Sequence, residues 1–138
     1  MKLTFKQIMG AVLFAALSST VIDAIIFFIF KGLGIFDETI IDPASKATLT
    51  IAPVIMASIM PSLVAGLVFF LFEKFSNNGF KIFSIVSIVL VLLSLISPFN
   101  IPNVAMGFAI GLNLMHLVVA ANVLFFINRA KKAQLENI

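Results

Sequence analysis

The run GAVLFAALSSTVIDAIIFFIF, residues 10–30, is apolar along almost its whole length and contains a single ionisable residue, Asp23. A membrane-spanning helix needs about 20 consecutive, mainly apolar residues. This run meets that requirement and ends where Lys31 begins the next segment. The run therefore predicts a transmembrane helix. The number of such runs in the chain gives the number of membrane-spanning helices in the fold.

Three further runs of the same kind follow, at residues 50–72, 82–97 and 105–127. Of the 138 residues, 62% are hydrophobic and 11% are charged, whereas about a quarter of the residues in soluble domains are charged. The segments between the runs are too short to form a second domain. The sequence therefore predicts an all-α, integral membrane four-helix bundle that forms a single domain over residues 1–138.

The first run also has features of a secretory signal peptide, because Lys2 and Lys6 precede it and Ala15 and Ala16 are small. The apolar part of a signal peptide is about 7–15 residues long and is followed by polar mature sequence. Here the apolar run continues to Phe30. We interpret it as an uncleaved first helix.

The basic residues lie just outside the apolar runs and are unevenly distributed. The loop after the first run and the loop after the third run together contain two, Lys31 and Lys46. The N-terminal segment, the loop after the second run and the C-terminal segment together contain seven, namely Lys2, Lys6, Lys74, Lys81, Arg129, Lys131 and Lys132. Loops rich in Lys and Arg stay in the cytoplasm, so we expect both termini there, in a multi-pass protein of the cell membrane, the bacterial inner membrane. The net charge of +3 forms no continuous basic stripe, so we expect no nucleic-acid partner.

Polar and proline residues at the ends of the runs predict local structure. Asp42-Pro43 resembles an N-cap followed by an N1 proline, so we expect a helix to begin there and to continue into the second span. Asn103 is placed to cap the fourth helix. Asn122 lies near the inner end of its span, where we expect it at the membrane interface. Pro61 should kink the second helix, because proline removes a backbone hydrogen bond.

An acid inside a span costs about 2.5–3.5 kcal/mol on insertion scales, so Asp23 needs a reason. With a rise of about 1.5 Å per residue, Asp23, Ser58 and Asn113 lie about 10–12 Å below the outer ends of their helices, and His116 about 16 Å. We expect His116 to reach Asp23 directly or through one water. The candidate ligand-binding or proton-linked residues are Asp23, His116, Asn113, Ser19, Thr20, Ser58 and Ser62.

The same residues also have purely structural interpretations. Ser58, Ser62 and Gly66 form a small-residue seam, which in membrane helices serves close packing. Serine and threonine hydroxyls often donate back to their own helix, and Asn113 is suited to a hydrogen bond across helices. These alternatives stay open at the level of sequence.

The favoured function is a polar intramembrane pocket that binds or carries a small hydrophobic or cationic molecule. The alternative is a structural or accessory subunit whose small-residue faces pack against a copy of itself or another membrane protein. An Asp–His pair acting in proton transfer on a lipidic substrate is a weaker, enzymatic alternative. One histidine, one intramembrane acid and no cysteine are too few for a protein metal site, so we expect no metal, no cofactor, and membrane lipid as the main partner.

Four spans and an acid in the first helix resemble the small multidrug-resistance transporters. The substrate pocket of those transporters uses Trp and Tyr, both absent here. Their antiparallel dimers need chains with little bias in Lys and Arg between the two sides, whereas this chain has a strong bias. The likeness is therefore kept only as an alternative. LNLMHLV at 112–118 and LLSLISP at 92–98 resemble an uncharacterised family of small bacterial four-helix membrane proteins, known as a domain of unknown function. That resemblance implies fold and location and supplies no activity.

Overall fold

A computed structural model describes residues 1–137 of the chain. Its elements are α1 (Phe5–Gly32), η1 (Ile35–Asp37), α2 (Ile51–Phe75), α3 (Gly79–Ser94), η2 (Ser97–Asn100) and α4 (Met106–Glu136). Within the described residues the only β-type pairing is an isolated bridge between Asp42 and Ala47. The four long helices are each long and apolar enough to cross a membrane, α3 together with η2. The predicted all-α membrane bundle is confirmed.

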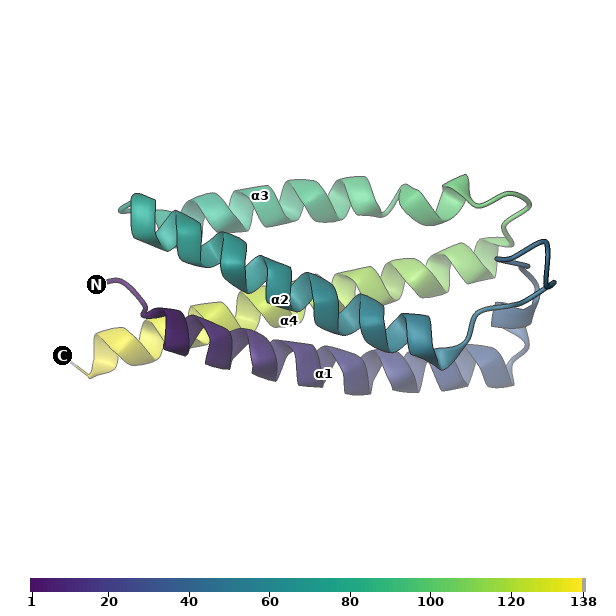
Figure 1. Cartoon of the computed structure of the whole chain (residues 1–138), viewed down its shortest axis with the longest axis horizontal. Helices are drawn as coiled ribbons and strands as arrows, with labels where there is room; N and C mark the ends of the chain where they lie inside the picture. The colour runs from purple at the N-terminus through teal and green to yellow at the C-terminus, as the bar shows by residue number, and fades with distance from the viewer. Residues whose placement is uncertain (138) are drawn as a thin grey trace.

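Both termini and the α2–α3 turn lie at one end of the bundle (Figure 1), which we call the terminal end. The other end, the loop end, carries η1, η2 and the long segment between α1 and α2 (Figure 1). Helix α1 packs along α2 and α4, and α3 also packs on α2 and α4 but does not contact α1. The shared location of the termini agrees with four spans, and their cytoplasmic side stays a prediction.

Helix α1 begins before the apolar run because its N-terminus is capped. The Thr4 hydroxyl accepts the Gln7 N–H at 3.3 Å, and the Gln7 side chain accepts the Thr4 N–H at 2.8 Å. This reciprocal arrangement satisfies two backbone donors that a helix start otherwise leaves without partners. The helix then runs through to Gly32.

The helical period buries one face of α1 and turns the other toward lipid. Phe14, Val21 and Ile25 are exposed, whereas Ser19 and Asp23 are buried, as their spacing predicts. The core of the terminal half contains Leu3, Ile8, Ala11, Val12, Ala15, Phe69, Phe83, Val123 and Ile127. The core of the other half contains Phe27, Phe36, Leu49, Val54, Phe108 and Met115.

The small-residue seam of α2 is used inside the chain. Ser58 and Ser62 are fully buried, and Gly66 lies against Val12 of α1. A Cβ added to Gly66 would come within 2.8 Å of Val12 Cγ2. Close approach of α1 and α2 therefore depends on this seam, in the manner typical of membrane helices.

The Phe36 side chain of η1 closes the loop end of the bundle. It is fully buried, and its ring centroid lies 5.8 Å from that of Phe27, 5.3 Å from Phe30 and 5.4 Å from Phe108. Gly111 provides the space, because a Cβ there would lie 2.6 Å from the Phe36 ring. The long loop is thus anchored in the core by one aromatic side chain.

The predicted helix start at Asp42-Pro43 is wrong, because α2 begins only at Ile51. The Asp42 carboxylate accepts the Ala44 N–H at 3.0 Å and the Ser45 hydroxyl, which is an Asx-type turn. Lys46 then adopts a left-handed backbone conformation with φ of 56°. The chain therefore closes on itself in a turn instead of entering a helix.

The predicted cap at Asn103 is also wrong. Asn103 has a left-handed φ of 55°, and Ala105 is the N-cap residue of α4. The Ala105 N–H donates to the buried Thr39 hydroxyl at 2.9 Å. The start of α4 is thus tied to the long loop, a partner that local sequence does not reveal.

Candidate functional site

Asp23 lies in the loop-end half of α1 and is only 1% exposed. Its Oδ2 accepts the Ser58 hydroxyl of α2 at 2.7 Å. That hydroxyl also lies 3.0 Å from the Val54 carbonyl, and because it carries one proton it can serve the two acceptors only in turn. Asp23 Oδ1 has no hydrogen-bond partner within residues 1–137. The carboxylate is therefore incompletely satisfied at a depth where water is scarce.

His116 of α4 lines the same cavity as Asp23, with a volume of about 220 Å³. Its Nδ1 is buried and has no hydrogen-bond partner in the described part of the chain. No direct hydrogen bond joins His116 to Asp23 in residues 1–137. A pairing through one water remains a prediction, and the cavity has room for it because a liquid water occupies about 30 Å³.

A second cavity, of about 310 Å³, adjoins the first at His116. It lies between α2, α3 and α4 and is lined by Ala57, Pro61, Ala65, Ser87, Leu90, Val91, Ser94, His116, Val119, Ala120 and Val123. Ala57, His116 and Val119 line both cavities. His116 thus stands between a small chamber that contains a carboxylate and a larger chamber with mainly aliphatic walls.

Pro61 lies inside α2 and lines the larger cavity. Proline has no N–H to donate to the carbonyl four residues earlier, which is that of Ala57. The backbone at Ala57 therefore lacks one helical hydrogen bond where the two cavities meet. This is the location that the sequence predicted for a change in the course of α2.

Three other predicted site residues bond back to the helix or to a neighbouring one. Thr20 donates to the Ala16 carbonyl at 2.7 Å, and Ser62 to the Ser58 carbonyl at 2.8 Å. Asn113 Nδ2 donates to the Leu95 carbonyl at 3.1 Å. None of the three lines either cavity. The contacts of Thr20 and Ser62 agree with the structural interpretation of these residues, whereas Asn113 Oδ1 is buried without a hydrogen-bond partner in residues 1–137.

Asn122 forms a hydrogen bond across two helices, and its place at the membrane interface stays a prediction. Its Nδ2 donates to the hydroxyl of the fully buried Ser19 at 3.1 Å, which joins α4 to α1. The rotation of α4 about its axis turns the Asn122 side chain toward α1. The position of Asn122 near the end of its span gave no indication of this contact. Ser19 is thereby engaged and lines neither cavity.

The sequence reasoning overlooked Glu73, which is buried near the terminal end of α2. Its Oε1 accepts the Leu3 N–H at 3.1 Å and the Lys131 ammonium at 2.6 Å. The available signal was an acid directly before Lys74, at an end otherwise dominated by positive charge. Such an acid is well placed to pair with one of the surrounding lysines.

Within the described residues, no group of three or more His, Cys, Asp or Glu side chains is arranged to hold a metal ion. The site around Asp23 therefore contains one carboxylate, one imidazole and one hydroxyl, surrounded by aliphatic side chains. Such a set can accept hydrogen bonds, hold a positive charge or exchange a proton.

Residues 4–133 match a protein family described as a family of unknown function (DUF6069). The chain belongs to this family. The DUF6069 match includes α1 from its cap to its end, the three connections between the long helices, α2, α3 and all but the last residues of α4. The resemblance to an uncharacterised family is thereby confirmed. No curated protein and no solved structure matches the chain.

Proposed function

We propose that this protein binds, within the membrane, a small apolar molecule that carries a cationic or hydrogen-bond-donating group. One observation carries the proposal. Asp23 Oδ1 and His116 Nδ1, both buried and without partners in residues 1–137, line one cavity that adjoins a larger aliphatic cavity at His116.

The polar chamber would hold the charged or donating group of the ligand. Buried polar atoms in proteins are normally hydrogen-bonded, and an unsatisfied polar group in hydrocarbon costs several kcal/mol. An ammonium or hydroxyl group in the chamber would supply a donor to Asp23 Oδ1, while Ser58 continues to bond Oδ2. Ionisable residues inside spans mark ligand or ion pathways in many membrane proteins.

The larger chamber would hold the apolar body. Its volume of about 310 Å³ lies at the lower end of the range of about 300–1,000 Å³ for small-molecule pockets. Its walls come from α2, α3 and α4, and α3 makes no packing contact with α1. A hydrophobic molecule dissolved in the bilayer could therefore enter between α3 and its neighbours.

The pocket is favoured over an accessory role because of where the small residues lie. The seam of Ser58, Ser62 and Gly66 is buried within the chain, so it is not an outer face for a partner. The outer face of α3 carries large aliphatic side chains such as Ile88 and Leu92, and lipid covers such a face as well as a protein would.

The test measures binding of n-octylammonium, whose N–H groups can donate to Asp23 Oδ1, to the purified chain in nanodiscs of zwitterionic lipid. We expect saturable binding to the wild type, at least about tenfold weaker binding to Asp23→Asn, and little binding of octyl methyl ether, which carries neither a charge nor a hydrogen-bond donor. Asp37→Asn makes the same substitution in the exposed loop and should bind like the wild type. Equal affinity of the wild type and Asp23→Asn, or no binding to either, would contradict the proposal.

A further inference from the structure

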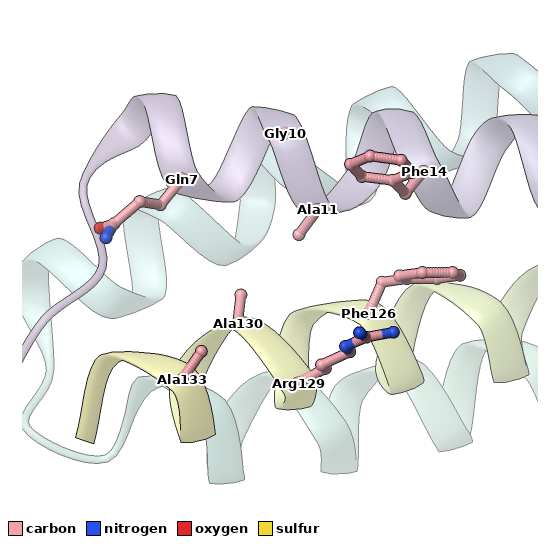
Figure 2. Close-up of a pocket in the computed structure, with 8 residues that line it drawn as sticks. All are labelled: Gln7, Gly10, Ala11, Phe14, Phe126, Arg129, Ala130 and Ala133. Atoms are coloured by element: carbon pink, nitrogen blue, oxygen red, sulfur yellow. The ribbon is translucent and has the colours of Figure 1, made fainter. Parts of the chain in front are cut away.

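A groove of about 450 Å³ lies between α1 and α4 at the terminal end (Figure 2), and its lining includes no residue of the cavity around Asp23. Its walls include four residues with little or no side chain, Gly10 and Ala11 of α1 and Ala130 and Ala133 of α4. A Cβ added to Gly10 would meet no atom within 4 Å. The space beside Gly10 is therefore open.

Two contacts between α1 and α4 bracket this groove. At the limit of the groove nearer the chain termini, the Gln7 side chain donates a hydrogen bond to the Gln134 side chain. Deeper in, the rings of Phe14 and Phe126 stack with centroids 6.1 Å apart (Figure 2). From Gln7 to Phe14 the helix rises about 10 Å. The aromatic stack holds the helices apart, and the small residues between the two contacts leave the groove unfilled.

Arg129 provides the charge at this groove (Figure 2). It is exposed, and it forms no ion pair with an acid in residues 1–137. It also lines an adjoining groove that contains Lys132 and Glu136. The apolar run 105–127 ends two residues before Arg129, and Lys and Arg near the ends of spans extend their side chains toward the lipid headgroups.

We infer that this groove holds an anionic phospholipid, with its phosphate on Arg129 and one acyl chain between Gly10 and Ala130 against the stacked Phe14 and Phe126. The planar guanidinium can donate two parallel hydrogen bonds to phosphate. Basic pockets between transmembrane helices on the cytoplasmic side bind anionic headgroups, and the charge distribution predicts that this end is cytoplasmic. Free phosphate has no apolar part, so a site for free phosphate would not need the apolar walls of this groove.

The dimensions of the groove favour an acyl chain over a helix from another protein. A helix about 10 Å across would have to displace either the Gln7–Gln134 hydrogen bond or the Phe14–Phe126 stack. A single hydrocarbon chain can lie between them. The inference stands independently of the proposed pocket, which lies around Asp23 on the loop-end side of this groove.

The test uses native mass spectrometry of the full chain released from detergent with defined lipids. We expect the wild type to retain one phosphatidylglycerol in preference to phosphatidylcholine with the same acyl chains. Arg129→Gln should reduce this preference about tenfold. Lys81→Gln, which removes the same charge at the start of α3, should leave it unchanged. Millimolar inorganic phosphate should not displace the lipid.

A second variant tests the acyl-chain part of the site. Gly10→Leu places a side chain in open space, so the helix content and elution volume should stay those of the wild type while lipid retention is lost. Equal retention of both lipids by the wild type, equal losses in Arg129→Gln and Lys81→Gln, full retention by Gly10→Leu, or displacement by phosphate would each overturn the inference.

Discussion

Lys131 of α4 donates a 2.6 Å hydrogen bond to the Oε1 of Glu73 on α2, whose side chain is only 3% exposed. The same oxygen accepts the Leu3 N–H at 3.1 Å. Gly79 of α3 packs against this residue so closely that a Cβ there would lie 2.7 Å from Glu73 Cα. One carboxylate thus joins the N-terminal segment to α2 and α4 at the terminal end.

Lys131→Met should lower the free energy of unfolding by about 3 kcal/mol, because it leaves a buried carboxylate without its cation. Unfolding in mixed micelles, followed by circular dichroism, measures this. Lys132→Met removes the same charge from the next residue, which is exposed, and should change the free energy by less than about 0.5 kcal/mol. Similar losses in both variants would show that the Glu73 contact contributes no stability.

Gly111→Ala should destabilise the protein by about 1–3 kcal/mol, because the added Cβ would lie 2.6 Å from the Phe36 ring and overpacking has a cost of this order. Gly10→Ala is the matched control in α1, where an added Cβ meets nothing within 4 Å. It should be neutral or stabilising by up to about 1 kcal/mol, from helix propensity. The melting temperature should therefore fall in Gly111→Ala and should stay the same or rise in Gly10→Ala.

Asp23→Asn and His116→Ala should change stability non-additively, because both side chains line one cavity and a water there would couple them. We expect a coupling free energy of about 0.5 kcal/mol or more in a double-mutant cycle. Asp23→Asn combined with Lys131→Met, at the terminal end, should be additive within about 0.5 kcal/mol. A strictly additive Asp23–His116 cycle would mean that the two residues act separately.

Asp37 should give the loop end a small acid sensitivity. Hydrogen bonds from Lys31 and then from Thr48 hold the pKa of Asp37 below its ordinary value. Since the folded-state pKa is below the unfolded value of about 3.9, the contribution is present above about pH 4 and is lost as pH falls through the folded pKa. Asp37→Asn should therefore lower the melting temperature slightly at pH 7, and the difference from wild type should vanish at low pH.

The control for this pH series is Glu38→Gln, which neutralises the adjacent exposed residue. Glu38 forms no ion pair within the described residues, so its variant should melt like the wild type at pH 7. If both variants lower the melting temperature equally, the effect belongs to the net charge of the loop and not to the Lys31–Asp37 contact.

The charge distribution predicts that reporter fusions after Asn77 and at the C-terminus are cytoplasmic, and that a fusion near Asp42 is on the opposite side. Paired phosphatase and fluorescent-protein fusions measure this. The common location of the termini and the α2–α3 turn (Figure 1) requires the first two fusions to agree. A periplasmic signal from either of them would contradict the predicted orientation.

The class of the fold could be predicted from the sequence because insertion into a bilayer is a local property. The transfer free energies of neighbouring residues add along a run such as 10–30, whatever the rest of the chain does. The helical period is local too, and the spacing of Asp23 and Phe14 puts them on opposite faces of α1, one buried and one exposed in the structure. Four spans and the buried faces of α1 and α2 therefore followed from the residues alone.

The partners of the polar residues were decided by the tertiary structure. Asn122 bonds Ser19, and Glu73 bonds Lys131, in each case across two helices far apart in the sequence. These pairs depend on how each helix is rotated and shifted against its neighbour, and depth along a single helix carries no such information. The loop at Asp42 also could not be predicted from the sequence. There, a turn closed by the Asp42 side chain formed in place of a helix start.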